Sequence, residues 1–166
     1  MKKREYTVYK SKELGDIYII SDGEAIVNVE LFEDGWEKAS DQYEMVKSDA
    51  PLLQEAVKQF DEYFQGKRTT FQLPLKWKGT PFQQKVWQAL CDIPYGMTAS
   101  YSDIAGKIGH PKAVRAVGQA NRANELAIIV PCHRVIGKNR ALIGYAGNRT
   151  DVKEKLLHLE ERYRNG

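Results

Sequence analysis

The chain has 166 residues, of which 42% are hydrophobic, and this length and composition suit one mid-sized domain or two small ones with a real core. They argue against a disordered chain, and no window holds the roughly 18 uncharged apolar residues that a membrane helix needs. The basic residues 2–4 lead into Glu5 rather than into an apolar signal core, so we expect a cytoplasmic protein with no membrane partner.

Charge is divided unevenly along the chain. Residues 1–75 carry 10 Lys and Arg against 15 Asp and Glu, a net charge of −5, whereas residues 76–166 carry 15 against 7, a net charge of +8. Such asymmetry between halves indicates a nucleic-acid partner for the basic half, although a solvated basic face is its commoner cause.

The first 75 residues predict a small antiparallel sheet followed by a helix. Segments 6–9, 15–20 and 25–32 have the composition of strands, with turn residues at 21–23. From Pro51 the apolar residues fall at helical spacing until Gly66 ends the pattern. That apolar stripe comprises Leu52, Leu53, Ala56, Val57, Phe60 and Phe64.

A domain boundary is expected near residue 75. The linker-like segment 72–75 lies close to the point where the charge changes sign. We therefore expect an N-terminal supporting domain over residues 1–75 and a C-terminal domain over residues 76–166.

The second half predicts several short helices. Thr80 is a candidate N-cap with Gln83 at the third position, and the following helix runs through Leu90. Ser100 and Asp103 form a second capping box, which begins a helix over 101–108.

A break at residues 109–111 separates that helix from another over about 112–121, and a last helix is expected from about 150 to 164. Two short helices joined by a tight Gly-containing turn are typical of a helix-turn-helix, although many all-α regions that never bind DNA contain such a pair.

The cysteines and histidines argue against a metal site. Cys91 and Cys132 lie in dissimilar segments, so a fold held together by disulfide bonds is not expected and at least one thiol should be free. Three histidines without a Cys-x-x-Cys pair leave too few ligands at metal-like spacing. We predict no metal, and for Cys91 a structural position in the core.

Cys132 lies in the segment Val-Pro-Cys-His-Arg-Val at 130–135. A nucleophilic cysteine needs a neighbouring base or a positive field, and here His133 could accept a proton while Arg134 adds positive potential. Consecutive side chains on an extended segment point in opposite directions, however. By themselves, these residues favour an inert buried cysteine beside a surface histidine.

The stretch from Thr80 to Glu160 resembles the O6-alkylguanine-DNA alkyltransferase family, the methylated-DNA–protein-cysteine methyltransferases, segment by segment. The matching segments are 80–83, 86–87, 93–96, 100–101, 113–118, Asn124, 130–136, 144–147 and 156–160. The Pro-Cys-His-Arg-Val core is the most specific of them. The resemblance implies an α+β protein with a small ribonuclease H-like N-terminal sheet domain and a mostly helical C-terminal domain containing the helix-turn-helix.

The resemblance also implies a reaction. Cys132 would accept an alkyl group from the O6 oxygen of guanine, with O4-methylthymine as a second candidate substrate, in one irreversible turnover without a cofactor. His133 would deprotonate the thiol through a water, and Glu160 would orient the imidazole, following the logic of hydrolase triads. Asn124 would brace the active-site turn.

The implied substrate is double-stranded DNA, from which the damaged nucleotide must be rotated out of the stack. By resemblance Arg115 is the finger that enters the stack, and Tyr101 presses on the phosphate and contacts the flipped base. The further positions implied to contact DNA or the base are Ala113, Gly118, Val135, Tyr145 and Ala146.

Two positions depart from the family pattern. Glu125 follows Asn124 where many relatives have Pro, and Arg140 lies in a loop where many have Gly. Because neither belongs to the nucleophile or the relay, the departures bear on pocket width and rate. The small Ala146 favours a pocket that accepts groups larger than methyl.

Two alternatives belong to other classes. One is a helix-turn-helix regulator or damage sensor in which Cys132 is incidental. The other is a cysteine hydrolase, which would need an oxyanion hole that the sequence does not identify. For the alkyltransferase we expect a monomer.

Overall fold

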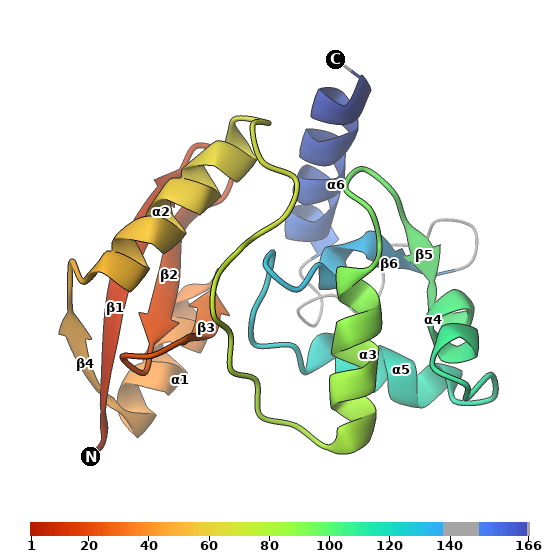
Figure 1. Cartoon of the computed structure of the whole chain (residues 1–166), viewed down its shortest axis with the longest axis horizontal. Coiled ribbons are helices and arrows are strands. Elements are labelled where there is room, and N and C mark those ends of the chain that lie inside the picture. Colours follow the sequence, from red (N-terminus) through yellow and green to blue (C-terminus); the bar gives the residue numbers. More distant parts are fainter. Residues whose placement is uncertain (138–149, 166) are drawn as a thin grey trace. The chain divides into compact units, whose positions relative to one another are not determined.

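The computed structural model describes residues 1–137 and 150–165 and divides the chain into two compact units (Figure 1). The N-terminal unit comprises Met1–Trp77 together with Glu125–Ala127. The C-terminal unit comprises Lys78–Asn124 and the described residues from Ile128 onward. Within the described part of the chain, no helix is long and apolar enough to cross a membrane.

The N-terminal unit is built on a four-stranded sheet in the order β3-β2-β1-β4. Its elements are β1 (Lys3–Ser11), β2 (Gly15–Ser21), β3 (Ile26–Glu30), α1 (Glu33–Gln42), β4 (Glu44–Lys47) and α2 (Pro51–Phe64). The three predicted strands are confirmed and pair antiparallel, β1 with β2 and β2 with β3. The structure adds β4, which pairs parallel to β1, and α1, neither of which the sequence pattern predicted.

The two helices cover opposite faces of this sheet. Side chains alternate between faces along a strand, so that Tyr9 meets α2 while Tyr18 meets α1. The Tyr9 ring stacks on Phe64 with the centroids 5.6 Å apart, and the Tyr18 ring stacks on Trp36 at 4.4 Å. The predicted stripe of α2 is buried at Leu53, Ala56, Phe60 and Phe64 and half-buried at Leu52 and Val57.

The C-terminal unit is mostly helical, as expected. Its elements are α3 (Pro81–Cys91), β5 (Ala99–Ser100), α4 (Tyr101–Lys107), α5 (Val114–Arg122), the 3-10 turn η1 (Cys132–Arg134), β6 (Val135–Ile136) and α6 (Thr150–Asn165). Both predicted capping boxes are present, at Thr80 and at Ser100. α5 begins two residues later than predicted, because the Ala113 amide donates to the His110 carbonyl and closes a turn there.

The core of this unit joins α3 to α5. Val86, Trp87 and Leu90 are buried on α3, and the Trp87 indole donates to the Ala120 carbonyl at 2.8 Å. The prediction that Cys91 lies in the core is wrong, because the side chain of this last residue of α3 is exposed. The buried side of the helix ends one residue earlier, at Leu90.

The segment leading to Cys132 is strained at one position. Ile128 has φ of 73°, in the left-handed region that a β-branched residue rarely adopts. Such conformations persist where the surrounding structure fixes them and cluster near functional sites. Ile128, Ile129 and Val130 are all buried, and their packing fixes the backbone that leads into η1.

Candidate active site

Cys132 is the first residue of η1 and is 4% exposed. Its amide donates to the Val130 carbonyl at 2.8 Å, and the Arg134 amide donates to the Pro131 carbonyl at 3.0 Å. The segment is therefore a tight turn rather than the extended strand assumed from the sequence. The surface histidine of the inert alternative is also wrong, since His133 is fully buried.

Asn124 holds this turn from the end of the preceding helical segment. Its Nδ2 donates to the Val130 carbonyl at 2.9 Å and lies 3.2 Å from the Sγ atom of Cys132. A second amide, that of Asn121, donates to the Cys132 carbonyl at 3.4 Å. Hydrogen bonds donated to sulfur stabilise the thiolate more than the thiol.

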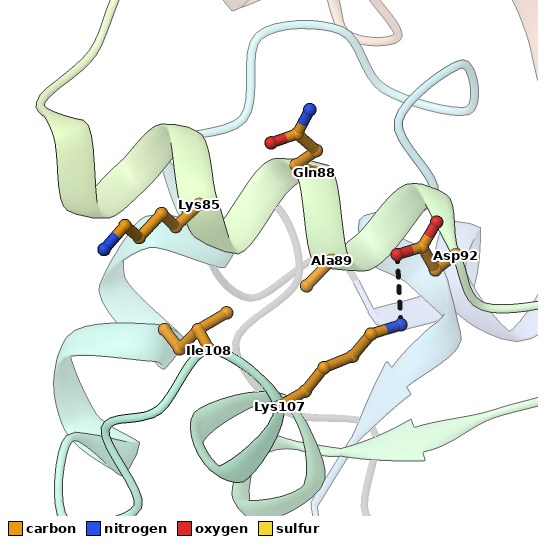
Figure 2. Close-up of a pocket in the computed structure, with 6 residues that line it drawn as sticks. All are labelled: Lys85, Gln88, Ala89, Asp92, Lys107 and Ile108. Atoms are coloured by element: carbon orange, nitrogen blue, oxygen red, sulfur yellow. Dashed lines mark ion pairs between the residues drawn. The ribbon is translucent and has the colours of Figure 1, made fainter.

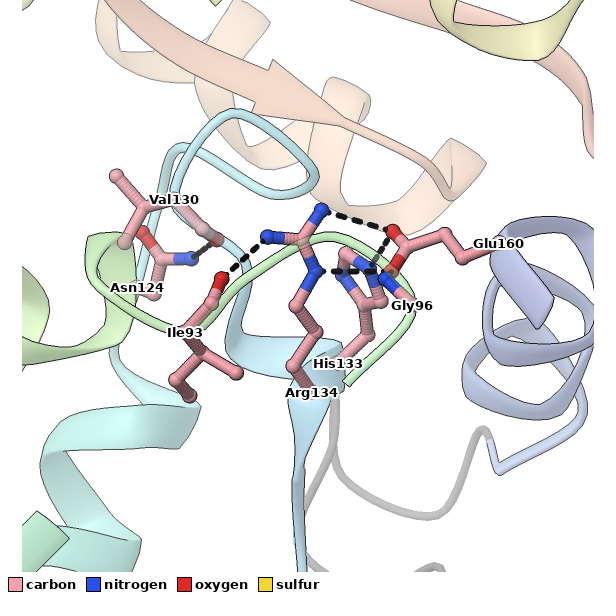
Figure 3. A network of polar contacts seen from close by, with 7 residues as sticks. All are labelled: Ile93, Gly96, Asn124, Val130, His133, Arg134 and Glu160. Carbon is pink, nitrogen blue, oxygen red and sulfur yellow. Dashed lines mark hydrogen bonds and ion pairs between the residues drawn. The ribbon is translucent and has the colours of Figure 1, made fainter. Parts of the chain in front are cut away.

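Glu160 of α6 lies at the centre of a buried polar network, drawn in Figure 3. Its Oε2 atom is 2.6 Å from Nε2 of His133, and its side chain has no exposed surface. Arg134 donates to the same carboxylate through Nε at 2.9 Å and Nη2 at 3.1 Å. The sequence alone would have placed Glu160 on a solvated helix face.

The turn after α3 completes this network. The Ile93 carbonyl accepts from Nη1 of Arg134 at 2.8 Å, and the Gly96 amide donates to Oε1 of Glu160 at 3.2 Å (Figure 3). Gly96 has φ of +77°, and a Cβ atom there would lie 2.5 Å from Cδ of Arg164. Glycine is therefore needed where the backbone approaches the carboxylate.

Burial dominates the electrostatics of the two residues that would exchange a proton. It raises the pKa of Cys132 to about 11, against the hydrogen bond from Asn124 and the positive charge of Lys153. It also lowers the pKa of His133, which Glu160 opposes. For Glu160, burial would raise the pKa, but His133 and Arg134 outweigh it and hold that pKa well below its ordinary range.

Lys153 is the residue that sequence reasoning missed. It is fully buried on α6, where burial lowers its pKa to about 8 and the charge of Cys132 opposes that shift. Its Nζ atom is 6.0 Å from the centre of the Tyr101 ring. The signal in the sequence was a lysine at core spacing, among Val152, Leu156 and Leu159.

The positive potential at the thiol therefore has a different source from the one expected. Arg134 donates hydrogen bonds to Glu160 and to the Ile93 carbonyl, and its positive charge is paired with the Glu160 carboxylate. Lys153 acts on Cys132 instead. The expectation for Arg134 is corrected, because the turn directs its side chain toward α6.

The residues expected to meet DNA lie in several places. Arg115 and Arg122 are exposed on α5, seven residues apart and so on one side of the helix. Tyr101 begins α4 half-buried, and a Cβ atom on Gly118 would be 3.9 Å from its ring. Ala113 is half-buried at the start of α5, and Val135 is buried in β6, paired with Ala99 of β5.

Three residues singled out from the sequence lie outside the described residues: Arg140, Tyr145 and Ala146. Among the residues that the structure does describe, no group of three His, Cys, Asp or Glu side chains could hold a metal ion.

A hollow of about 450 Å³ lies between α3 and α4 (Figure 2). It is lined by Lys85, Gln88, Ala89, Asp92, Lys107 and Ile108. Lys107 is paired with Asp92 at 3.1 Å across it. Its lining contains no nucleophile or base of the candidate site.

Comparison with known proteins gives the same family from both halves of the chain. Residues 5–77 match the family model of the 6-O-methylguanine DNA methyltransferase ribonuclease-like domain, and residues 81–162 match that of its DNA binding domain. The chain is 53% identical over 148 residues to the constitutive methylated-DNA–protein-cysteine methyltransferase of Bacillus subtilis, covering 89% of this chain and 90% of that protein.

Two solved structures from Mycobacterium tuberculosis are similar throughout. One is O6-methylguanine methyltransferase, with a TM-score of 0.86, 41% identity and coverage of 96% of this chain and 94% of that one. The other is OGT in complex with DNA, with a TM-score of 0.83, 38% identity and coverage of 97% and 94%.

Proposed function

This chain belongs to the 6-O-methylguanine DNA methyltransferase family, and from this membership we propose that it repairs DNA by direct reversal of alkylation damage. It moves an alkyl group from the O6 oxygen of guanine onto Cys132. The observation that carries the proposal is the buried arrangement of a cysteine beside an amide donor, a lysine, and a histidine–glutamate pair. A structural cysteine would need none of these partners.

The transfer is a displacement at carbon. The Sγ atom attacks the carbon bound to O6, the carbon–oxygen bond breaks, and a thioether forms while guanine keeps the electron pair and takes up a proton. Because nothing removes the alkyl group, each chain acts once, and no cofactor is needed. The product on DNA is an intact guanine.

His133 acts as the general base, through one water. Its Nε2 atom is held by Glu160, whereas its buried Nδ1 atom has no hydrogen-bond partner among the described residues and can accept the thiol proton. Since burial raises the pKa of the Cys132 thiol to about 11 despite Asn124 and Lys153, a base is required at neutral pH. Asn124 and Lys153 stabilise the thiolate that results.

The helical pair α4–α5 is the DNA-binding element. The target carbon is hidden in the base stack, so the nucleotide must be flipped out at a cost of about a few kcal/mol. The exposed Arg115 enters the gap, Tyr101 contacts the flipped base and its phosphate, and the half-buried Ala113 and Gly118 let the backbone come close. The positive charge of residues 76–166 favours the encounter with DNA.

We further propose that the protein acts as a monomer in the cytoplasm on double-stranded DNA. The N-terminal domain, residues 1–75, supports the catalytic domain, residues 76–166. The relatives named above come from Bacillus subtilis and Mycobacterium tuberculosis, and bacteria carry their DNA in the cytoplasm.

The test follows the alkyl group. The full chain is incubated with duplex DNA that carries isotopically labelled O6-methylguanine, and peptides are analysed by mass spectrometry. We expect a single methyl group per chain, on Cys132, with none transferred in Cys132→Ala and normal transfer in Cys91→Ser. Tight binding to the lesion with the label left on the DNA would support the damage-sensor alternative instead.

A further inference from the structure

Arg134 is bound by all three nitrogens of its guanidinium group. Nε and Nη2 donate to the two oxygens of Glu160 at 2.9 and 3.1 Å, and Nη1 donates to the Ile93 carbonyl at 2.8 Å. Its side chain is 7% exposed, and the guanidinium lies 5.7 Å from the centre of the Tyr95 ring. A fork of this kind fixes both the position and the plane of the carboxylate.

The carboxylate is therefore shared among Arg134, His133 and the Gly96 amide. Oε2 accepts from Arg134 and contacts His133, while Oε1 accepts from Arg134 and from the Gly96 amide (Figure 3). Arginine side chains carry their positive charge at neutral pH. Beside Arg134, Glu160 is an anion at neutral pH, and a proton that reaches His133 is not passed on to it.

The charges around His133 have opposite effects on its pKa: Glu160 raises it, whereas Arg134 and Lys153 lower it. Glu160 and Lys153 face it from α6, Arg134 follows it in the same turn, and Cys132 precedes it. Without Arg134 the full charge of Glu160 would act on the imidazole at 2.6 Å and favour its protonated form. A histidine that is already protonated cannot accept the thiol proton.

We propose, building on the function proposed above, that Arg134 is a positioning residue that keeps His133 neutral until the thiol proton arrives. It does so by sharing the Glu160 carboxylate with the imidazole and offsetting part of its charge. When transfer begins, the proton leaves Sγ of Cys132, passes through the water and stops on Nδ1 of His133, while Nε2 keeps the hydrogen that it donates to Glu160 throughout.

A purely structural brace would use the same bonds, so the test reads the charge state of His133 directly. The full chain is labelled with ¹³C-histidine, and the ring signals are followed by NMR from pH 5 to pH 9 in the wild type, Arg134→Gln and Arg134→Lys. His110 and His158 are exposed and serve as internal controls. Amide spectra establish that each variant is folded.

We expect the titration midpoint of His133 to rise by roughly one pH unit or more in Arg134→Gln, with the controls unchanged. Arg134→Lys keeps one positive charge but cannot bond both oxygens, so its midpoint should rise by less. A folded Arg134→Gln variant with an unshifted or lower midpoint would overturn the proposal. If Arg134→Lys folds and Arg134→Gln does not, an unshifted His133 midpoint in Arg134→Lys would overturn the proposal.

The pH profile of methyl transfer gives a second readout. In Arg134→Gln, transfer should be slow at pH 7 and recover as the pH rises through the new midpoint, whereas loss of a brace would slow transfer equally at every pH. Faster transfer at low pH would contradict the need for a neutral imidazole. Because the NMR midpoint needs no DNA, it still tests Arg134 if the wild type transfers nothing and the proposed function itself fails.

Discussion

The side-chain amide of Asn124 lies 3.2 Å from the Sγ atom of Cys132, the atom proposed to become alkylated. The same Nδ2 atom donates to the Val130 carbonyl at 2.9 Å. One side chain thus shapes the turn that presents the thiol and also stabilises its deprotonated form. Both contacts come from a residue eight positions before the cysteine.

Replacing Asn124 with Ala should slow methyl transfer at neutral pH. A hydrogen bond to a charged group contributes about 1.5–3 kcal/mol, which corresponds to a loss of roughly 10- to 100-fold in rate. Asn124→Asp keeps the shape but places a carboxylate beside the thiolate, so it should be slower still. Single-turnover rates measured against pH should show the loss shrinking at high pH, and equal loss at every pH would contradict thiolate stabilisation.

Replacing Lys153 with Met should separate stability from activity. The pKa of this buried lysine falls from 10.5 to about 8, so at pH 7 the folded protein holds a charge that burial disfavours. Methionine removes that cost, and the free energy of unfolding at pH 7 should rise by about 1–3 kcal/mol. Because the cost applies below the folded pKa and disappears as pH passes 10.5, the gain should be smaller at pH 10.

The same variant loses the cation that faces Cys132. We expect methyl transfer at pH 7 to fall by about tenfold or more, because the pKa of the thiol rises further. Urea unfolding and single-turnover assays on one preparation test both effects. A variant that is less stable and equally active would contradict this account of Lys153, and Lys155→Met, on the exposed side of α6, is the matched control.

Glu160→Gln should destabilise the protein mainly above pH 5. The pKa of Glu160 lies below its ordinary value of 4.5 in the folded state, so its contribution is fully present above pH 4.5 and is lost progressively as the pH falls from that value toward the folded pKa. Removing it leaves Arg134 buried without its anion, at a cost of about 3–5 kcal/mol. Stability curves from pH 7 to pH 3 should converge for the two proteins, and parallel curves would show that Glu160 does not titrate as inferred.

Arg115→Ala should impair repair of duplex DNA far more than reaction with free O6-benzylguanine, because only the duplex requires a finger in the stack. Arg122, exposed on the same side of α5, is the comparison. Arg122→Ala should weaken DNA binding and reduce its salt dependence without changing the ratio between duplex and free base. An equal loss on both substrates in Arg115→Ala would argue against the finger role.

Local features of this fold could be predicted from the sequence, while features that depend on distant contacts could not. The capping boxes at Thr80 and Ser100 need only residues three positions apart, and both are present. β4 was missed because its pairing of Glu44 with Lys3 joins segments about 40 residues apart and its side chains are mostly exposed. α1 was missed because it carries only half-buried and exposed side chains over Glu33–Gln42.

The candidate site likewise depends on contacts between residues that are distant in the sequence. The resemblance to a family pointed to Cys132, His133 and Glu160, but their spacing alone did not, because His133 and Glu160 are 27 residues apart and meet only in the fold. Arg134 was assigned to the wrong partner for the same reason. Lys153 was overlooked because a lysine on a helix is usually solvated, and only its burial reveals a role.

Methylation of Cys132 should destabilise the folded protein. The thiol is 4% exposed and its sulfur contacts Asn124 at 3.2 Å, so a methyl group must be accommodated inside a packed turn where an added methylene costs about 1–3 kcal/mol. For a chain of this size each kcal/mol lowers Tm by roughly 2–4 °C. Thermal unfolding of Cys91→Ser, before and after reaction with one equivalent of O6-methylguanine duplex and removal of the DNA, isolates the effect on Cys132. An unchanged or higher Tm would mean that the site has room for the product, and Cys132→Ala carried through the same steps controls for the DNA.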